Sequence, residues 1–301
     1  MEDTGARSNP APAVSVPPAD RPTGLDALMP PEIAAKAEDI GVSKASMSTL
    51  RTFALSVLAG AFIGLGAMFA TTVVAGAAGS VPFGITRLLA GVVFCLGLIL
   101  VVVAGAELFT GNNLIVIAWA DRRIPLTWLL RNWGIVYVGN LVGALATVLL
   151  VFAGGQYEFG GGEIGVSALS IAEAKGSLGF GQALALGIMC NALVCLAIWL
   201  TYSARSVTDK ILAVLFPITA FVAAGFEHSI ANMFFLPMGV LIREQGSDSF
   251  WSSVSETPAD FANVTWADTV ANLIPVTIGN VVGGSLMVGL VYWLIYVRTR
   301  S

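Results

Sequence analysis

Long apolar runs separated by short polar connectors make up the chain from about residue 53 onwards. A helix needs about 20 apolar residues to cross a bilayer. Four charge-free runs meet that length: 53 to 79, 132 to 155, 178 to 204 and 269 to 297. The whole chain is 56% hydrophobic and only 11% charged, too little polar surface to cover a water-soluble globule. The pattern predicts an all-α integral membrane protein.

Two further apolar runs, 88 to 120 and 211 to 242, are too long for one span and too short for two. As straight helices they would measure nearly 50 Å, at about 1.5 Å per residue. A helix broken inside the membrane solves this, because irregular backbone is tolerated where it is buried in protein or lines a cavity. We therefore expect six spans, with the second and fifth helices broken at the midplane.

Lysine and arginine predict the orientation, because cytoplasmic connections carry the positive excess. With the N-terminus inside, the cytoplasmic side receives Lys44, Arg51, Arg122, Arg123, Arg131, Arg205, Lys210, Arg298 and Arg300. The other side then receives only Arg87, Lys175 and Arg243. We expect both termini in the cytoplasm.

The chain before the first span divides into two parts. Residues 1 to 29 are rich in Pro, Ala and Asp and lack an apolar signal segment, which predicts a disordered cytoplasmic tail. Residues 30 to 48 have apolar positions at helical spacing after two prolines, which predicts a short amphipathic helix near the membrane surface. The six-span domain takes up 49 to 301.

An internal similarity pairs the two overlong runs. Residues 107 to 112 read ELFTGN and residues 227 to 232 read EHSIAN, each with Glu followed five positions later by Asn. The sequence GNLVGA from residue 139 likewise resembles GNVVGG from residue 279. Three spans per half make an inverted repeat, in which broken helices at matching positions indicate a binding site near the midplane.

Three ionisable residues fall inside the six predicted spans: Glu107, Glu227 and His228. A charge there costs at least about 3 kcal/mol, so such residues usually face a cavity or pathway. Each glutamate stands where a second half-helix begins, which favours a structural role at the unpaired N–H groups. Asn112 and Asn232 serve the same turns or line the path. His228 is interpreted as a pore-lining hydrogen-bond donor, the alternative being a satisfied core histidine.

No cofactor or metal site is expected. One histidine and three scattered cysteines, Cys95, Cys190 and Cys195, give no ligand cluster and no disulfide. The sequence also lacks a basic cluster near an aromatic platform, which argues against a nucleic-acid partner.

Several long motifs in order closely resemble the formate/nitrite transporter family, and look most like its formate channel branch. They are GAELFTGN (105 to 112), NWGIVYVGNLVGA (132 to 144), SARSVTDK (203 to 210), GFEHSIANMFFLPMG (225 to 239) and NLIPVTIGNVVGG (272 to 284). The resemblance runs from about residue 30 to the C-terminus. It implies an aquaporin-like fold in a homopentamer of the bacterial inner membrane, with one pore per protomer.

The resemblance also implies which residues line that pore. His228 matches the central histidine, and Thr110 matches the threonine that hydrogen-bonds it from the loop of the broken second helix. Leu98, in that loop, and Phe221, just before the fifth-helix break, match apolar residues that narrow the pore, with Phe94 beside them.

Other matches lie at the two sides of the membrane. Lys175 and Asn191 match polar residues on the outer side that attract the anion and tune the histidine. Residues 30 to 48 match an N-terminal helix implicated in gating, whereas the long tail before it departs from the family pattern.

These observations predict a channel for formate and related small monovalent anions, with proton-coupled, pH-dependent permeation through the central histidine. Nitrite, hydrosulfide, acetate and lactate are further expected substrates, and a nitrite or hydrosulfide channel is the closest alternative. An ammonium or water channel is less favoured, because half-helix N-termini attract anions. An intramembrane hydrolase pairing His228 with Ser285 is the distant alternative, and we expect no enzyme.

Overall fold

The structure is a computed structural model that describes residues 27 to 298, so most of the predicted tail, 1 to 29, lies outside the described residues. Its helices in the first half are α1 (Pro30–Ser46), α2 (Thr49–Val74), α3 (Phe83–Leu100), η1 (Val101–Gly105), α4 (Phe109–Asn112), η2 (Asn113–Ile115), α5 (Val116–Ala120), α6 (Leu126–Ala153) and η3 (Gln156–Glu158). The second half contains α7 (Glu163–Gly176), α8 (Phe180–Ser203), α9 (Val207–Ala224), α10 (Ser229–Gln245), α11 (Asp248–Ser253), η4 (Pro258–Asp260), α12 (Trp266–Val281), η5 (Val282–Leu290) and η6 (Trp293–Val297).

Six helical stretches are long and apolar enough to cross a membrane, which confirms the predicted all-α six-span fold. They are α2, α3 with η1 (Phe83–Gly105), α6, α8, α9 and the long stretch from α12 through η6 (Trp266–Val297). The second of them begins earlier than the predicted run and so contains Arg87 within α3. The short helices α7 and α11, on the predicted outer side, were not expected from the sequence.

Each overlong apolar run contains two helical segments joined by a short extended stretch. The first segment ends at Gly105, which has φ of +83°, and α4 begins at Phe109. The second pair is joined through Gly225, with φ of +76°, after which α10 begins at Ser229. Positive φ is the conformation that glycine adopts at little cost, so these residues end the preceding helix. That these stretches lie at the midplane of a bilayer stays a prediction.

Close helix contacts hold each half together at glycines. A Cβ at Gly143 of α6 would lie 1.9 Å from the carbonyl oxygen of Val57 in α2. In the second half, a Cβ at Gly283 in η5 would lie 2.1 Å from the carbonyl oxygen of Ile188 in α8. Only glycine allows backbones to approach this closely, so the α2/α6 and α8/η5 contacts are made in the same way.

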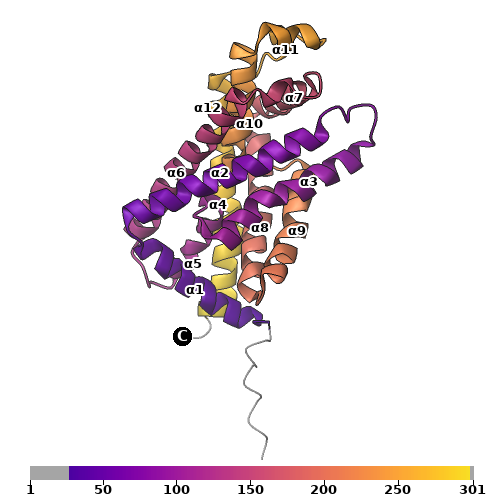
Figure 1. Cartoon of the computed structure of the whole chain (residues 1–301). Helices are drawn as coiled ribbons and strands as arrows, with labels where there is room; N and C mark the ends of the chain where they lie inside the picture. Colours follow the sequence, from indigo (N-terminus) through magenta and orange to yellow (C-terminus); the bar gives the residue numbers. More distant parts are fainter. Residues whose placement is uncertain (1–26, 299–301) are drawn as a thin grey trace, which may run out of the picture.

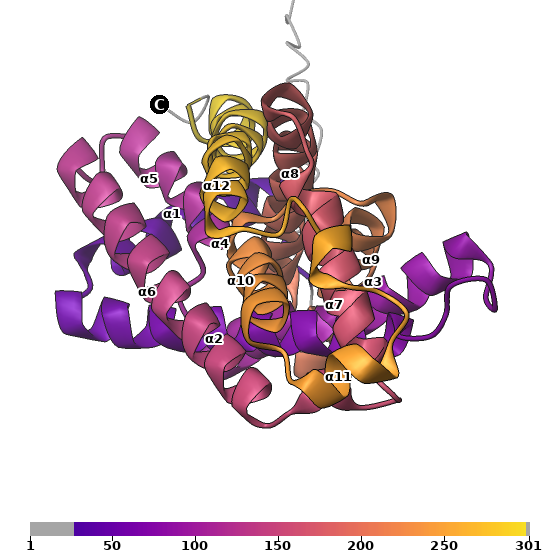
Figure 2. The same ribbon diagram turned by 90° about the horizontal axis from the view of Figure 1, so that it is seen from above.

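The two short helices that precede α2 and α8 lie at opposite ends of the molecule. Figure 1 shows α1 at the same end as α5 and the end of the yellow helix, whereas α7 and α11 lie at the other end. Seen from above, α11 and α7 cover the end that faces the viewer (Figure 2). At its own end, α1 is held by the Lys36 ammonium, which donates to the Tyr202 carbonyl at 2.7 Å. The placement of α1 and α7 at opposite ends of the molecule is what an inverted repeat requires.

Candidate functional site

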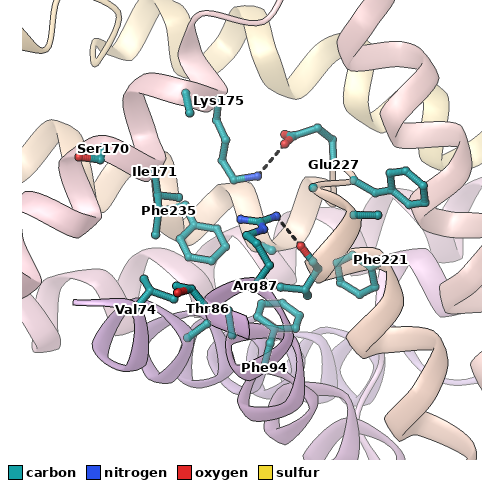
Figure 3. A pocket seen from close by; sticks show the side chains of 18 of the residues that line it. Val74, Thr86, Arg87, Phe94, Ser170, Ile171, Lys175, Phe221, Glu227 and Phe235 are labelled. Carbon is teal, nitrogen blue, oxygen red and sulfur yellow. Dashed lines mark hydrogen bonds and ion pairs between the residues drawn. The ribbon is translucent and has the colours of Figure 1, made fainter. Parts of the chain in front are cut away.

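A pocket of about 780 Å³ opens at the end of the molecule that carries α7. Its ionisable lining residues are Arg87 of α3, Lys175 of α7, and the neighbouring Glu227 and His228. Figure 3 shows Lys175 and Arg87 extending toward each other into this space from different helices. The pocket therefore combines two cations with one carboxylate, above a largely apolar interior.

Aromatic rings close the inner part of the pocket. Phe94 and Phe221 meet edge to face, with ring centroids 5.6 Å apart, and both are almost fully buried. Phe221 in turn stacks on the imidazole of His228, at 5.8 Å between centroids. Phe235 lies beside Phe94 at 6.5 Å. These three phenylalanines and His228 all line the pocket, and the predicted role of Phe94 and Phe221 in narrowing a pore stays a prediction.

The fixed hydrogen bonds of His228 assign its tautomer. His228 caps α10, with Nδ1 accepting from the backbone N–H of Ala231 at 3.0 Å. Because Nδ1 is an acceptor, the ring proton belongs on Nε2, 3.0 Å from the hydroxyl oxygen of Thr110. The neutral imidazole thus donates to Thr110, whose own hydroxyl hydrogen stays available to a further acceptor.

A cluster built around Glu107 fixes the first non-helical stretch. The Lys44 ammonium donates to Glu107 at 2.7 Å and to the amide oxygen of Asn112 at 2.9 Å. The Asn112 amide donates to Glu107 at 2.7 Å and to Asn132 at 2.9 Å. Asn132 then donates to the carbonyl oxygen of Lys44 at 3.3 Å, which closes the ring.

The second half repeats this cluster around Glu227. Lys175 donates to Glu227 at 2.8 Å, and Asn232 donates to Glu227 at 2.6 Å and to Asn272 at 2.7 Å. Asn272 closes the ring onto the Lys175 carbonyl at 2.9 Å. The cluster around Glu227 lacks the counterpart of the bond from Lys44 to the amide oxygen of Asn112, because the amide oxygen of Asn232 is buried without a partner. Lys175 consequently uses fewer of its three N–H donors on the cluster than Lys44 does.

Two further asparagines bind the starts of α4 and α10. The side-chain oxygen of Asn140 accepts from the Phe109 N–H at 2.9 Å, and Asn280 accepts from the Ser229 N–H at 2.9 Å. Each also donates to the carbonyl of the adjacent glutamate at 2.9 Å. The free N–H groups at these helix starts, near which Glu107 and Glu227 were expected to act, are thus bound by asparagines. The carboxylates pair with lysines instead, because an asparagine supplies both an acceptor and a donor at each turn. The structural role of the two glutamates stays a prediction.

The structure corrects the positions of two residues predicted to lie in the loop. Leu98 lies in α3, and Thr110 lies in the first turn of α4. The apolar run stays helical as far as Gly105, so the non-helical stretch is shorter and later than expected.

Asn191 contacts the backbone of Thr110 and is not among the residues that line the pocket. It donates to Asn113 at 2.9 Å, to the Thr110 carbonyl at 3.3 Å and to the Asn280 carbonyl at 2.6 Å. These bonds tie α4 to α8 and α12. The pore roles of Asn191 and Leu98 stay predictions.

Sequence reasoning missed Lys44, Arg87 and the asparagines of α6 and α12 as parts of the site. A signal for the asparagines was present, since NWGIVYVGN (132 to 140) and NLIPVTIGN (272 to 280) place Asn and Gly-Asn at the same spacing. The sequence marked Lys44 only as a cation on the cytoplasmic side and gave no indication of its contact with Glu107. Arg87 had no signal beyond its charge, because its helix begins earlier than the apolar run.

The geometry does not support hydrolysis. The Ser285 hydroxyl is 3.4 Å from the Asn113 carbonyl, whereas His228 Nε2 faces Thr110.

In the part of the chain that the structure describes, no three His, Cys, Asp or Glu residues gather as metal ligands.

A six-span helical protein with a cationic pocket leading to a buried, hydrogen-bonded histidine is a membrane transport protein. Its class is narrower still, because residues 31–294 match the formate/nitrite transporter family. The chain belongs to the formate/nitrite transporter family.

Its relatives are channels and transporters rather than enzymes. The formate channel FocA of Escherichia coli (strain K12) is 48% identical over 284 residues, covering 94% of this chain and 99% of the relative. Formate channel FocA of Haemophilus influenzae is 40% identical, covering 87% and 93%. A solved "Pentameric formate channel with formate bound" has a TM-score of 0.79 and 46% identity, covering 82% of this chain and 97% of that one.

Proposed function

We propose that the chain is a formate channel of a bacterial inner membrane, assembled as a homopentamer with both termini in the cytoplasm. Similarity to formate channels over nearly the full length supports the substrate, and similarity to a pentameric formate channel supports the assembly. The excess of Lys and Arg on the α1 side supports the orientation. Nitrite, hydrosulfide, acetate and lactate are related monovalent anions that we expect to permeate more slowly.

The observation that carries this proposal is the contact between His228 Nε2 and Thr110 Oγ1 at 3.0 Å. It joins the start of α10 to the start of α4, and His228 lines the pocket beside the aromatic rings. An anion arriving there meets N–H and O–H donors in an environment with little water, where a hydrogen bond to an anion is strong.

The path runs from the pocket mouth to this pair. Lys175, whose charge is paired with Glu227, offers its remaining N–H donors to the anion. Phe94 and Phe221 form the outer apolar constriction. Leu98 forms a further apolar constriction, and Asn191 fixes Thr110 by holding its carbonyl. The apolar rings favour an uncharged species, because a bare ion loses its hydration there.

Proton coupling follows from the same geometry. His228 carries its mobile proton on Nε2, toward Thr110, while Nδ1 is held by the α10 cap. Passing a proton to formate in water is uphill, but a dry pore penalises the separated charges more than the neutral acid. We infer that formate crosses as formic acid, with the proton supplied from solution. The arriving anion stabilises imidazolium, which forms when Nδ1 takes up a solution proton in place of its bond from the Ala231 N–H. Imidazolium then passes its Nε2 proton by way of Thr110 to formate and becomes neutral again.

A flux panel in proteoliposomes tests the proposed substrate. Formate, nitrite, hydrosulfide, ammonia and glycerol are offered separately to the purified protein, with empty liposomes as the control. We expect formate to be fastest and glycerol to be excluded. Faster flux of nitrite or hydrosulfide would assign the chain to that substrate instead, and flux of neutral solutes alone would exclude an anion channel.

A further inference from the structure

Arg87 differs from the other charged groups of the pocket because its partners are neutral. Its Nε donates to the Ala223 carbonyl at 3.3 Å, and its Nη2 donates to the Val222 carbonyl. Within the described residues, no ion pair with Arg87 is present, although Glu227 lies close enough to interact with it through space. Figure 3 shows the guanidinium between the α9 carbonyl and the Lys175 ammonium.

The charge of Lys175, in contrast, is already matched. Its ammonium lies 2.8 Å from Glu227, and the side chains are 15% and 5% exposed. A close pair of opposite charges has little net field at a distance. With neutral His228, the four ionisable lining residues leave one net positive charge, and that charge is the contribution of Arg87.

Arg87 also interrupts the correspondence between the two halves. Glu107, Asn112 and Lys44 have counterparts in the second half, but the position matching Arg87, counted back from the paired glycines Gly105 and Gly225, is Val207. Arg87 therefore adds a positive charge at the α7 end of the pathway, and its counterpart Val207 adds none in the second half. Gly225 accommodates the arginine, because a Cβ there would lie 3.3 Å from Arg87 Nη2.

We propose that Arg87, with the unused donors of Lys175, forms an outer anion-binding subsite that concentrates the substrate above the Phe94 and Phe221 rings. This inference rests on the proposed function. Arginine has five N–H donors, and the bonds to Ala223 and Val222 use Nε and Nη2, which leaves Nη1 for a planar carboxylate such as formate. The carbonyl bonds hold the guanidinium at the C-terminus of α9, where a cation is favoured.

The test compares wild type, Arg87→Lys, Arg87→Gln and Arg243→Gln in proteoliposomes, with gel filtration to confirm unchanged assembly. Arg243 is the matched control, since its guanidinium also donates to backbone carbonyls, those of Pro258 and Val264, but does not line the pocket. Initial formate flux is measured at subsaturating and saturating substrate, at low salt and in concentrated potassium gluconate.

We expect Arg87→Gln to reduce flux about three- to tenfold at subsaturating formate and low salt. The substitution removes the net positive charge that raises the local concentration of the anion in the pocket. The deficit should nearly vanish at saturating formate, and also in about 1 M salt, where the screening length falls to about 3 Å. Arg87→Lys keeps the charge but not the planar set of donors, so it should lose less flux than Arg87→Gln, and its loss should also shrink in high salt. Arg243→Gln should behave like wild type.

Two results would overturn the subsite. One is wild-type flux in Arg87→Gln at low salt; the other is an equal, salt-independent loss in Arg87→Gln and Arg87→Lys, which would make Arg87 only a cap for α9. Failure of the wild type to carry formate would instead refute the proposed function. The same four proteins are therefore also assayed with nitrite, which tests Arg87 independently of the preferred anion.

Discussion

The matching roles of Asn140 and Asn280 give a quantitative prediction about stability. In Asn140→Ala, the N–H of Phe109 and the carbonyl of Glu107 lose their partner in a buried site. In Asn280→Ala, the N–H of Ser229 and the carbonyl of Glu227 lose theirs. Each buried group left without a hydrogen bond costs about 1–3 kcal/mol, so either variant should lose about 2–6 kcal/mol of unfolding free energy.

The third bond of each asparagine adds little to this figure. Asn140 also donates to the Ser56 carbonyl and Asn280 to the Gly187 carbonyl, both in the interior of a helix. Such carbonyls have a helical partner as well, so they remain satisfied after the substitution. The losses in the two variants should therefore agree to within about 1 kcal/mol.

Equilibrium unfolding in mixed detergent and denaturant measures both losses. Asn263→Ala is the control, because this half-exposed asparagine loses one side-chain bond to Glu173 and keeps its backbone bond to the same carboxylate. It should lose about 1 kcal/mol or less. Wild-type stability in either core variant, or a large loss in one and none in the other, would refute the shared role of the two asparagines.

Two further predictions concern packing and pH. Gly283→Ala should destabilise by about 1–3 kcal/mol in thermal or chemical unfolding because of overpacking against the Ile188 carbonyl, whereas Gly181→Ala, with open space at its Cβ, should not destabilise. Burial raises the pKa of Glu38 in α1 above its ordinary value, although Arg123 lies 3.1 Å away and opposes the shift. A raised pKa means that folding favours the neutral carboxyl. The contribution of Glu38 to the docking of α1 is therefore largest below its unfolded pKa, near 4.3, and it declines as pH rises through the raised folded pKa. Limited proteolysis before α2 should therefore be slower at about pH 4 than at about pH 7 in wild type, and this difference should shrink in Glu38→Gln.

The six spans were predictable because each rests on a single property, the length of an apolar run. The two overlong runs were also informative, since their excess length and the repeated Glu and Asn pointed to the stretches before Phe109 and Ser229. Helix starts were less accurate, because a helix continues through polar residues once its hydrogen bonds are formed.

The pairing of the buried charges was beyond the sequence. Lys44 is far from Glu107 in the chain, and Lys175 is far from Glu227, so only the packing of α1 and α7 brings them together. The contact between His228 and Thr110 entered through the family resemblance rather than through spacing. Arg87 was missed because its significance depends on which of its neighbours are charged.

In the proposed function, His228 passes a proton to the permeating anion. His228→Asn tests it most directly, because Asn is a good helix cap that can replace the bond from Nδ1 to the Ala231 N–H, yet has no titratable proton. Formate flux is measured in proteoliposomes at about pH 5 and about pH 7, on either side of the ordinary histidine pKa, beside wild type and His228→Phe. Formate flux should depend on pH in wild type, and it should be abolished or lose its pH dependence in both variants. Unchanged pH-dependent flux in His228→Asn would contradict this proton transfer and would leave His228 as a structural cap of α10.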